Sequence, residues 1–193
     1  LAKCFVKEKN NDSDYSVVAF TVDSDCFCHD VYSGLPVIPF EEITKQYPPE
    51  AYDLFVALGY SNLNALRKEK FCSAKQKGYK LASFISSRAT VLNAQNIGEN
   101  CFILENNTIQ PFAIIGDNVI IWSGNHIGHH STIHDHTFVA SHSVVSGGVD
   151  IGEQCFIGVN ATLRDHITIG DRCIIGAGAL LLADEEPDGV YIG

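Results

Sequence analysis

Histidines are concentrated in one short segment of the chain. Six of the eight lie within seventeen residues: His126, His129, His130, His134, His136 and His142. A neutral imidazole accepts a proton near pH 7, which is the task of a general base. Backbone N–H groups at nearby glycines can stabilise an oxygen that gains negative charge. This combination suits acyl transfer from a thioester, because a thiol with a pKa of about 8.5 is a good leaving group.

A six-residue repeat supplies the framework for these histidines. Every sixth residue from Ile85 to Leu181 is aliphatic, which gives seventeen such positions in a row. We expect these side chains to point into a core, and none of the six histidines occupies such a position. The residue four places later is usually small, as at Cys101, Cys155 and Cys173. We therefore expect these cysteines to be buried packing residues rather than redox groups.

A longer period of 18 lies on top of the repeat. Triplets of isoleucine, glycine and an acid recur at this spacing: Ile97-Gly98-Glu99, Ile115-Gly116-Asp117, Ile151-Gly152-Glu153 and Ile169-Gly170-Asp171. Three short strands then form one coil, and the repeats make about 5–6 stacked coils. The pattern resembles the hexapeptide repeat of left-handed parallel β-helices, and the left hand follows from that resemblance. We expect the acidic residues to lie in solvated turns.

The first part of the chain has a different composition. Residues 1–80 hold ten Lys/Arg and eleven Asp/Glu, whereas residues 81–193 hold three and twelve. We therefore expect an α/β domain over 1–80 and the β-helix over 81–193. The patterns predict helices at 1–9, 41–47 and 62–77 and extended segments at 17–22, 36–39 and 54–58. This is a small Rossmann-like unit, and we expect it to be incomplete because no Gly-rich turn precedes the first helix.

Composition narrows the possible functions. The net charge of −10 argues against a general nucleic-acid-binding protein. No uninterrupted apolar stretch is long enough to span a membrane, and no secretion signal opens the chain. Seven cysteines without a C-x-x-C pair favour reduced thiols. We expect a cytoplasmic protein with neither a nucleic-acid nor a membrane partner.

The histidine segment supports a more specific resemblance. Residues Ser123–Gly158 (SGNHIGHHSTIHDHTFVASHSVVSGGVDIGEQCFIG) resemble the sialic acid O-acetyltransferase-like hexapeptide-repeat family. That family includes N-acetyltransferases that act on nucleotide-linked 4-amino-4,6-dideoxy sugars. The resemblance implies an N-terminal domain that binds the nucleotide sugar, a β-helix that binds acetyl-CoA, and a homotrimer with sites between subunits. It places the protein in the assembly of surface polysaccharides such as O-antigen.

The same resemblance assigns the catalytic residues. His129, in Ile127-Gly128-His129-His130, matches the family's general base. His130 stands where the family often has a carboxylate that tunes the base, so the resemblance does not identify the residue that orients His129. Gly147 lies one coil further on and matches a glycine whose backbone faces the acetyl group.

Five further residues match binding positions of the family. Phe138 stands where a relative has a histidine that contacts the cofactor, and Val159 and Ala177 match residues that line the pantetheine channel. Asp23 resembles the acidic residue of the nucleotide site, and Gly59 resembles a glycine beside the substrate. Acetyl-CoA is the expected co-substrate, and no metal is expected.

Three alternatives remain open. The acceptor could be the hydroxyl of a sialic acid or another sugar, which the sequence does not distinguish from an amine. A γ-type carbonic anhydrase would hold zinc with three histidines, and His129 and His134 have the H-x4-H spacing of two of these ligands in that family. Asn93 and Ala94 occupy the region of the third ligand in that family. A non-catalytic trimer is the third alternative, because a fold does not fix a function.

Overall fold

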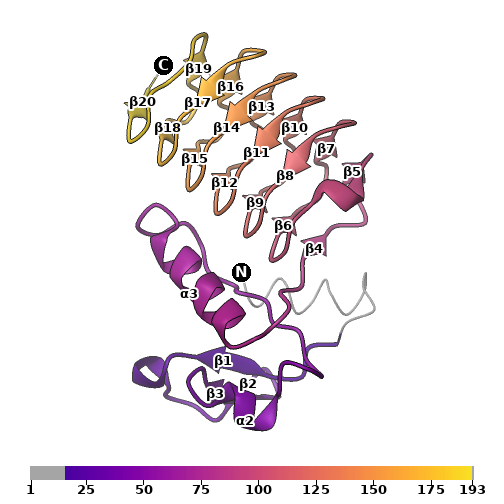
Figure 1. Cartoon of the computed structure of the whole chain (residues 1–193), viewed down its shortest axis with the longest axis vertical. Coiled ribbons are helices and arrows are strands. Elements are labelled where there is room, and N and C mark those ends of the chain that lie inside the picture. The colour runs from indigo at the N-terminus through magenta and orange to yellow at the C-terminus, as the bar shows by residue number, and fades with distance from the viewer. Residues whose placement is uncertain (1–15, 193) are drawn as a thin grey trace.

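The computed structural model describes residues 16–192, and the helix predicted at 1–9 lies outside them. The predicted fold class is confirmed: a small α/β region is followed by a left-handed parallel β-helix. Figure 1 shows the two parts one above the other, with α3 (Ala65–Gln76) lying between the small sheet and the stacked coils. No helix among the described residues is long and apolar enough to cross a membrane.

The N-terminal region is built on a three-stranded sheet. Its order is β1 (Phe20–Val22), β3 (Leu35–Pro39), β2 (Val31–Tyr32), with β1 parallel and β2 antiparallel to β3. A 3-10 turn, η1 (Ser24–Cys26), follows β1, and α2 (Ile43–Gln46) follows β3. The strand predicted over 54–58 is wrong, because Leu54 forms only an isolated bridge to Leu81. That segment is buried by packing against α3 rather than by pairing in the sheet.

The β-helix has three faces, each a sheet of parallel two-residue strands. Face 1 consists of β4 (Phe84–Ile85), β6 (Phe102–Ile103), β9 (Ile120–Ile121), β12 (Phe138–Val139), β15 (Phe156–Ile157), β18 (Ile174–Ile175) and β20 (Val190–Tyr191). Face 2 consists of β5 (Thr90–Val91), β7 (Thr108–Ile109), β10 (His126–Ile127), β13 (Val144–Val145), β16 (Thr162–Leu163) and β19 (Leu180–Leu181). Face 3 consists of β8 (Ile114–Ile115), β11 (Thr132–Ile133), β14 (Asp150–Ile151) and β17 (Thr168–Ile169), and η2 (Ala94–Asn96) precedes its first level.

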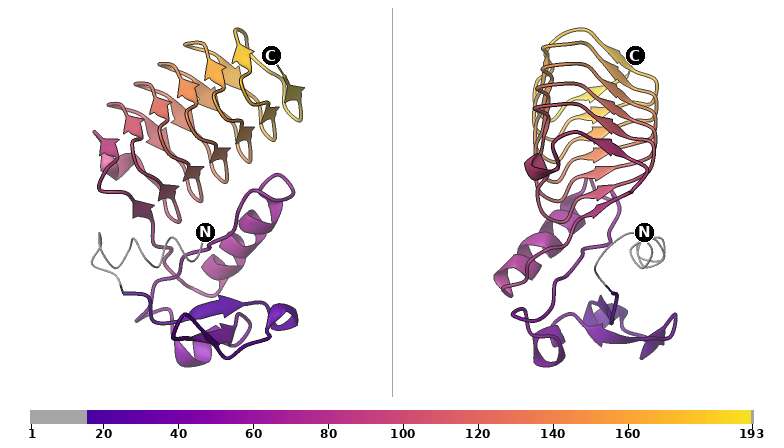
Figure 2. Two further views of the ribbon diagram at one scale, coloured as in Figure 1. Left: turned by 180° about the vertical axis from the view of Figure 1, so that it is seen from behind. Right: turned by 90° about the vertical axis from the view of Figure 1, so that its right-hand side faces the viewer.

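The coils stack with the predicted period. Strands of β4 to β19 pair with strands 18 residues away, as Ile127 pairs with Ile109 and Val145. The last step is shorter, since Ile174 pairs with Val190. The repeated aliphatic residue is the second residue of each strand and points inward. From Ile103 to Leu181 each is at most 4% exposed, and burying one such side chain contributes roughly 1.5–3 kcal/mol. Figure 2 shows the resulting prism.

The three corners of the prism repeat one backbone conformation. In each corner one residue has φ near +60°, at every sixth position from Asn100 to Gly178. The left-handed conformation excludes most side chains but accepts glycine, asparagine and histidine more readily. His130, His136 and His142 occupy these corner positions. We name each corner by the two faces that it joins. The 2/3 corner holds residues 110–113, 128–131, 146–149 and 164–167. The 1/2 corner is the turn after each strand of face 1, and the 3/1 corner is the turn after each strand of face 3.

The N-terminal region covers the outer side of face 1. The outward residues of successive strands there are large and apolar, and Phe84, Phe102 and Phe138 are at most 3% exposed. Phe55 and Tyr60, from the segment before α3, pack against this row with ring centroids 5.7 Å from Phe102 and 4.9 Å from Phe138. An apolar cluster therefore forms part of the junction between the two parts.

Candidate active site

His129 and His130 project from the 2/3 corner, between β10 and β11. Their Nδ1 atoms are 3.1 Å apart, so one of them donates a hydrogen to the other. The backbone N–H of His129 donates to Oε1 of Gln110 at 2.9 Å. Phe112 lies 4.8 Å from the His130 ring at an interplanar angle of 30°. When Nδ1 of His129 is the donor, its Nε2 is left free to accept a proton from an incoming group.

Gly147 lies directly under the His129 ring, one coil further on. A Cβ at Gly147 would come within 2.7 Å of Cε1 and 2.8 Å of Nε2 of His129, so only glycine leaves room for this ring. Among residues 16–192 the Gly147 N–H has no hydrogen-bond acceptor. The reason is visible in the repeat: Gly128 stands where Gln110 stands one coil earlier, and it has no side chain to accept this hydrogen. A free backbone donor therefore lies beside the imidazole.

The predicted acetyl-CoA residues fall in two other places. Val159 and Ala177 are exposed and stack one coil apart in the 1/2 corner, at the opposite edge of face 2 from His129 and Gly147. Phe138 is on face 1 and is 3% exposed, stacked on Phe156 at 5.5 Å. A direct contact between Phe138 and a ligand would require the surrounding rings to move.

The two residues predicted for the sugar nucleotide both contact α3. Oδ1 of Asp23 pairs with Nζ of Lys70 at 2.8 Å, and this hydrogen bond raises the pKa of Lys70. The carbonyl oxygen of Gly59 accepts a hydrogen bond from Arg67 at 3.2 Å. Helix α3 packs along the 3/1 corner, so one chain does not bring these residues to the 2/3 corner where His129 lies.

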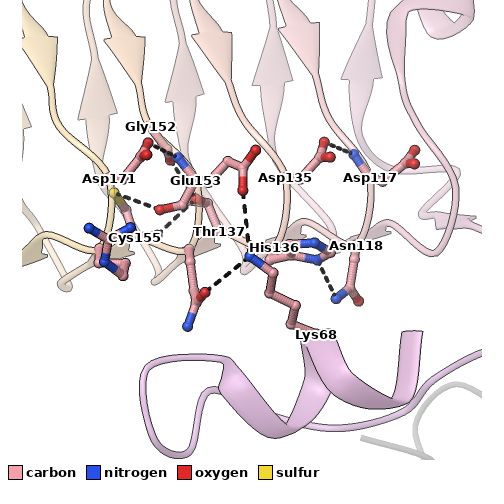
Figure 3. Close-up of polar contacts among 12 residues, drawn as sticks. Lys68, Asp117, Asn118, Asp135, His136, Thr137, Gly152, Glu153, Cys155 and Asp171 are labelled. Atoms are coloured by element: carbon pink, nitrogen blue, oxygen red, sulfur yellow. Dashed lines mark hydrogen bonds and ion pairs between the residues drawn. The ribbon is translucent and has the colours of Figure 1, made fainter. Parts of the chain in front are cut away.

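His136 belongs to the junction with α3 rather than to the solvent. It is 5% exposed, and its Nδ1 accepts a hydrogen bond from Nδ2 of Asn118 at 2.9 Å. Oδ1 of Asn118 in turn accepts a hydrogen bond from Nδ2 of Asn100 at 2.7 Å. The amide nitrogen of Asn118 therefore faces His136 and is the donor. Burial lowers the pKa of His136, with a further contribution from the charge of Lys68. Figure 3 shows His136 and Asn118 side by side above α3.

The acidic residues of the 3/1 corner have a structural role. Asp117, Asp135 and Asp171 each accept, through Oδ1, the backbone N–H of the residue 18 places earlier, at 2.7–2.9 Å. His134 pairs with Asp150 at 2.9 Å beside a shallow hollow of about 370 Å³ on face 3. Within residues 16–192 no three His, Cys, Asp or Glu side chains are placed to hold a metal ion.

Comparison with known proteins agrees with this architecture. Residues 96–129, 112–147 and 148–183 match the family described as bacterial transferase hexapeptide (six repeats). No curated protein gives a significant sequence match. A histidine-to-asparagine variant of perosamine N-acetyltransferase from Caulobacter crescentus, solved with CoA and GDP-perosamine, is 26% identical with a TM-score of 0.85, and the match covers 100% of this chain and 89% of that chain.

Two further solved structures are similar over most of their length. The acetyltransferase domain of PglB from Neisseria gonorrhoeae FA1090 is 27% identical with a TM-score of 0.84, and the match covers 99% of this chain and 91% of that one. WeeI from Acinetobacter baumannii AYE has a TM-score of 0.78 at 18% identity, with 100% and 90% covered, and supports the fold alone. Within the β-helix, residues 96–183 therefore match the bacterial transferase hexapeptide family.

Proposed function

We propose that this protein transfers an acetyl group from acetyl-CoA to the amino group of a nucleotide-linked 4-amino-4,6-dideoxy sugar, with His129 as the general base. The observation that carries the proposal is the pairing of His129 with Gly147, where an exposed imidazole lies against an unpaired backbone N–H. Two solved neighbours above 25% identity are acetyltransferases, and one of them was solved with CoA and GDP-perosamine.

Each group would perform one step of the transfer. Acetyl-CoA supplies the acetyl group as a thioester. The amine nitrogen forms a bond to the thioester carbonyl carbon, the C–S bond breaks, and Nε2 of His129 takes the amine proton. The Gly147 N–H would donate to the carbonyl oxygen as it gains negative charge. The thiolate leaves with the electron pair of the C–S bond and then takes up a proton from solvent. His130 would hold the His129 ring through the contact between their Nδ1 atoms.

The chain contains residues that suit acetyl-CoA. Val159 and Ala177 form an exposed column with little side-chain bulk at the 1/2 corner, which suits a narrow pantetheine arm. Arg164 lies in the 2/3 corner, as His129 does, and forms no ion pair among the described residues, so it would be available to phosphate. Arg172, by contrast, is held by both carboxylate oxygens of Asp188 at 2.6 and 2.7 Å.

A homotrimer would join the two parts of this site. Within one chain the Gly147 corner and the Val159 corner lie at opposite edges of face 2. A second copy would place its 1/2 corner beside the 2/3 corner of the first, which completes a site from residues of both. Sedimentation velocity tests this assembly directly.

The test is an acetylation assay on full-length protein with acetyl-CoA and a panel of GDP-, dTDP- and UDP-linked 4-amino-4,6-dideoxy sugars. Mass spectrometry should detect the gain of one acetyl group with one of them. His129→Asn should lower kcat/KM by about 10²–10⁴, the range for loss of a general base. A fully active His129→Asn variant would exclude this base. If none of the panel is acetylated but the hydroxyl of sialic acid or another sugar is, the acceptor is a hydroxyl group rather than an amine.

A further inference from the structure

Arg67 lies at the centre of the junction between the N-terminal region and the β-helix. Its side chain is fully buried, and its two Nη atoms donate to backbone carbonyl oxygens of Gly59 at 3.2 Å, His136 at 2.8 Å and Thr137 at 3.2 Å. No carboxylate within residues 16–192 pairs with it, and burial lowers its pKa to about 10. A buried cation without an anionic partner is unfavourable for folding, which points to a role other than stability.

The loop that Arg67 holds has a strained backbone. Between Gly59 and α3, three consecutive residues adopt left-handed conformations: Asn62, Leu63 and Asn64 have φ of 51°, 45° and 63°. Leucine rarely adopts this conformation, because its Cβ is crowded by the backbone. Such strain persists only where surrounding contacts fix it, and it is concentrated at functional sites.

The contacts that fix the loop come from two successive coils of the β-helix. Nδ2 of Asn64 donates to the carbonyl oxygen of Cys155 at 3.0 Å, and Nε2 of Gln154 donates to the carbonyl oxygen of Leu63 at 3.0 Å. Arg67 contacts the preceding coil, because it donates hydrogen bonds to the carbonyl oxygens of His136 and Thr137. It also donates to the carbonyl oxygen of Gly59 at the start of the loop. Arg67 therefore links the start of the loop to the coil that contains His129.

We propose that Arg67 is a positioning residue: it fixes the loop of residues 59–64 on the β-helix and thereby determines where the nucleotide-linked sugar is held relative to the acetyl-transfer site. The proposal rests on the function proposed above and on the resemblance of Gly59 to a glycine beside the substrate. A planar guanidinium can bond to carbonyl groups on both sides of the junction at once. A lysine ammonium is a single point and cannot keep this geometry.

Kinetics of matched variants test the proposal. Arg67→Met removes the charge and the donors but keeps an unbranched apolar chain of similar length. Arg67→Lys retains the charge without the fork. Lys75→Met is the control, because Lys75 is on the same helix and crosses the same junction to Glu99 at 2.6 Å, but in an exposed pair.

Arg67→Met should raise KM for the nucleotide sugar about tenfold or more, which corresponds to a loss of about 1.4 kcal/mol or more of binding free energy. KM for acetyl-CoA should stay within about twofold of wild type, since the 2/3 and 1/2 corners are not touched. Hydrogen exchange at the amides of residues 60–64 should become faster. Arg67→Lys should fall between wild type and Arg67→Met, and Lys75→Met should match wild type.

Two outcomes would overturn the positioning role. One is an Arg67→Met protein that is folded and keeps wild-type KM values and exchange rates. The other is an equal rise of both KM values, which a merely structural defect would produce. If Arg67→Met does not fold, Arg67→Lys takes its place, and a wild-type KM for the sugar then rejects the proposal. Absence of acetyl transfer in wild type would refute the proposed function, and the exchange rates would still report on the loop.

Discussion

Gly147→Ala tests the contact between the imidazole and the backbone at the 2/3 corner. The added Cβ would lie 2.7 Å from Cε1, 2.8 Å from Nε2 and 3.1 Å from Nδ1 of His129. Carbon contacts are favourable at about 3.5–4.0 Å, so the ring must move by roughly 0.8 Å or more. A misplacement of about 1 Å can reduce a rate about 10²-fold, which corresponds to ~2.7 kcal/mol in the barrier.

The substitution should leave the fold intact. The backbone of Gly147 is not in the left-handed region, so alanine is allowed there, and the exposed His129 ring can turn into the solvent. The melting temperature and acetyl-CoA binding by calorimetry should therefore be close to wild type, while kcat/KM in the acetylation assay falls about 10²-fold.

A double-mutant cycle tests whether Gly147→Ala lowers kcat/KM by displacing the His129 ring. In the His129→Asn background, Gly147→Ala should cause little further loss, because the ring that it displaces is gone. The reasoning fails if the single variant retains more than about a third of the wild-type kcat/KM. It also fails if the methyl group lowers the rate equally in both backgrounds, since the N–H rather than the ring would then be affected.

Two further predictions concern buried groups. The unfolded chain binds a proton at His136 more readily than the folded one, because the pKa of His136 is lowered in the fold. The free energy of unfolding is therefore highest above the unfolded pKa of about 6.5 and decreases as the pH falls below it. His136→Asn keeps an acceptor for Asn118 and should flatten the fall in melting temperature as the pH decreases below about 6.5, whereas an unchanged slope would contradict the assignment. Burial raises the pKa of the Cys101 and Cys155 thiols to about 12. Brief alkylation of native protein followed by peptide mapping should label Cys26, Cys28 and Cys72 but not Cys101, Cys155 or Cys173, and labelling of the inward thiols would contradict their burial.

The β-helix could be predicted in detail because its geometry determines the spacing of the inward-facing residues. Each coil turns through three equal sides, so an inward position must recur every six residues and a neighbour in the stack every 18. Ile127, Ile133 and Val139 follow each other on the three faces, as expected. The small inward residues, such as Cys155, were predicted for the same reason.

The arrangement of the histidines was only partly predicted. The cluster was visible, and none of its members points into the coil. The reason for the spacing of His130, His136 and His142 was missed: they continue a series of left-handed corner residues that includes Asn118 and Gly124. This asparagine–glycine series was the available signal. The burial of His136 under α3 could not be found from the repeat, because it depends on another part of the chain.

The N-terminal region was predicted less well. An apolar run such as 54–58 looks like a strand in sequence, but a strand requires a paired neighbour and here only Leu54 has a bridge. Arg67 was not singled out, because a charged residue inside a helix usually faces solvent. The roles of Asp23, Gly59, Phe138, Val159 and Ala177 stay predictions, since they concern ligands and subunit contacts.

The constant step of 18 residues also affects how the chain folds. Strand pairing in parallel sheets usually joins distant parts of a sequence and is therefore slow to form. Here every pair from β4 to β19 joins residues about one tenth of the chain apart. That separation is in the range of about 0.07–0.12 typical of helical bundles, which fold quickly for their size. Each coil needs only the coil before it as a template, so the β-helix can grow one level at a time, as in a linear array of repeats.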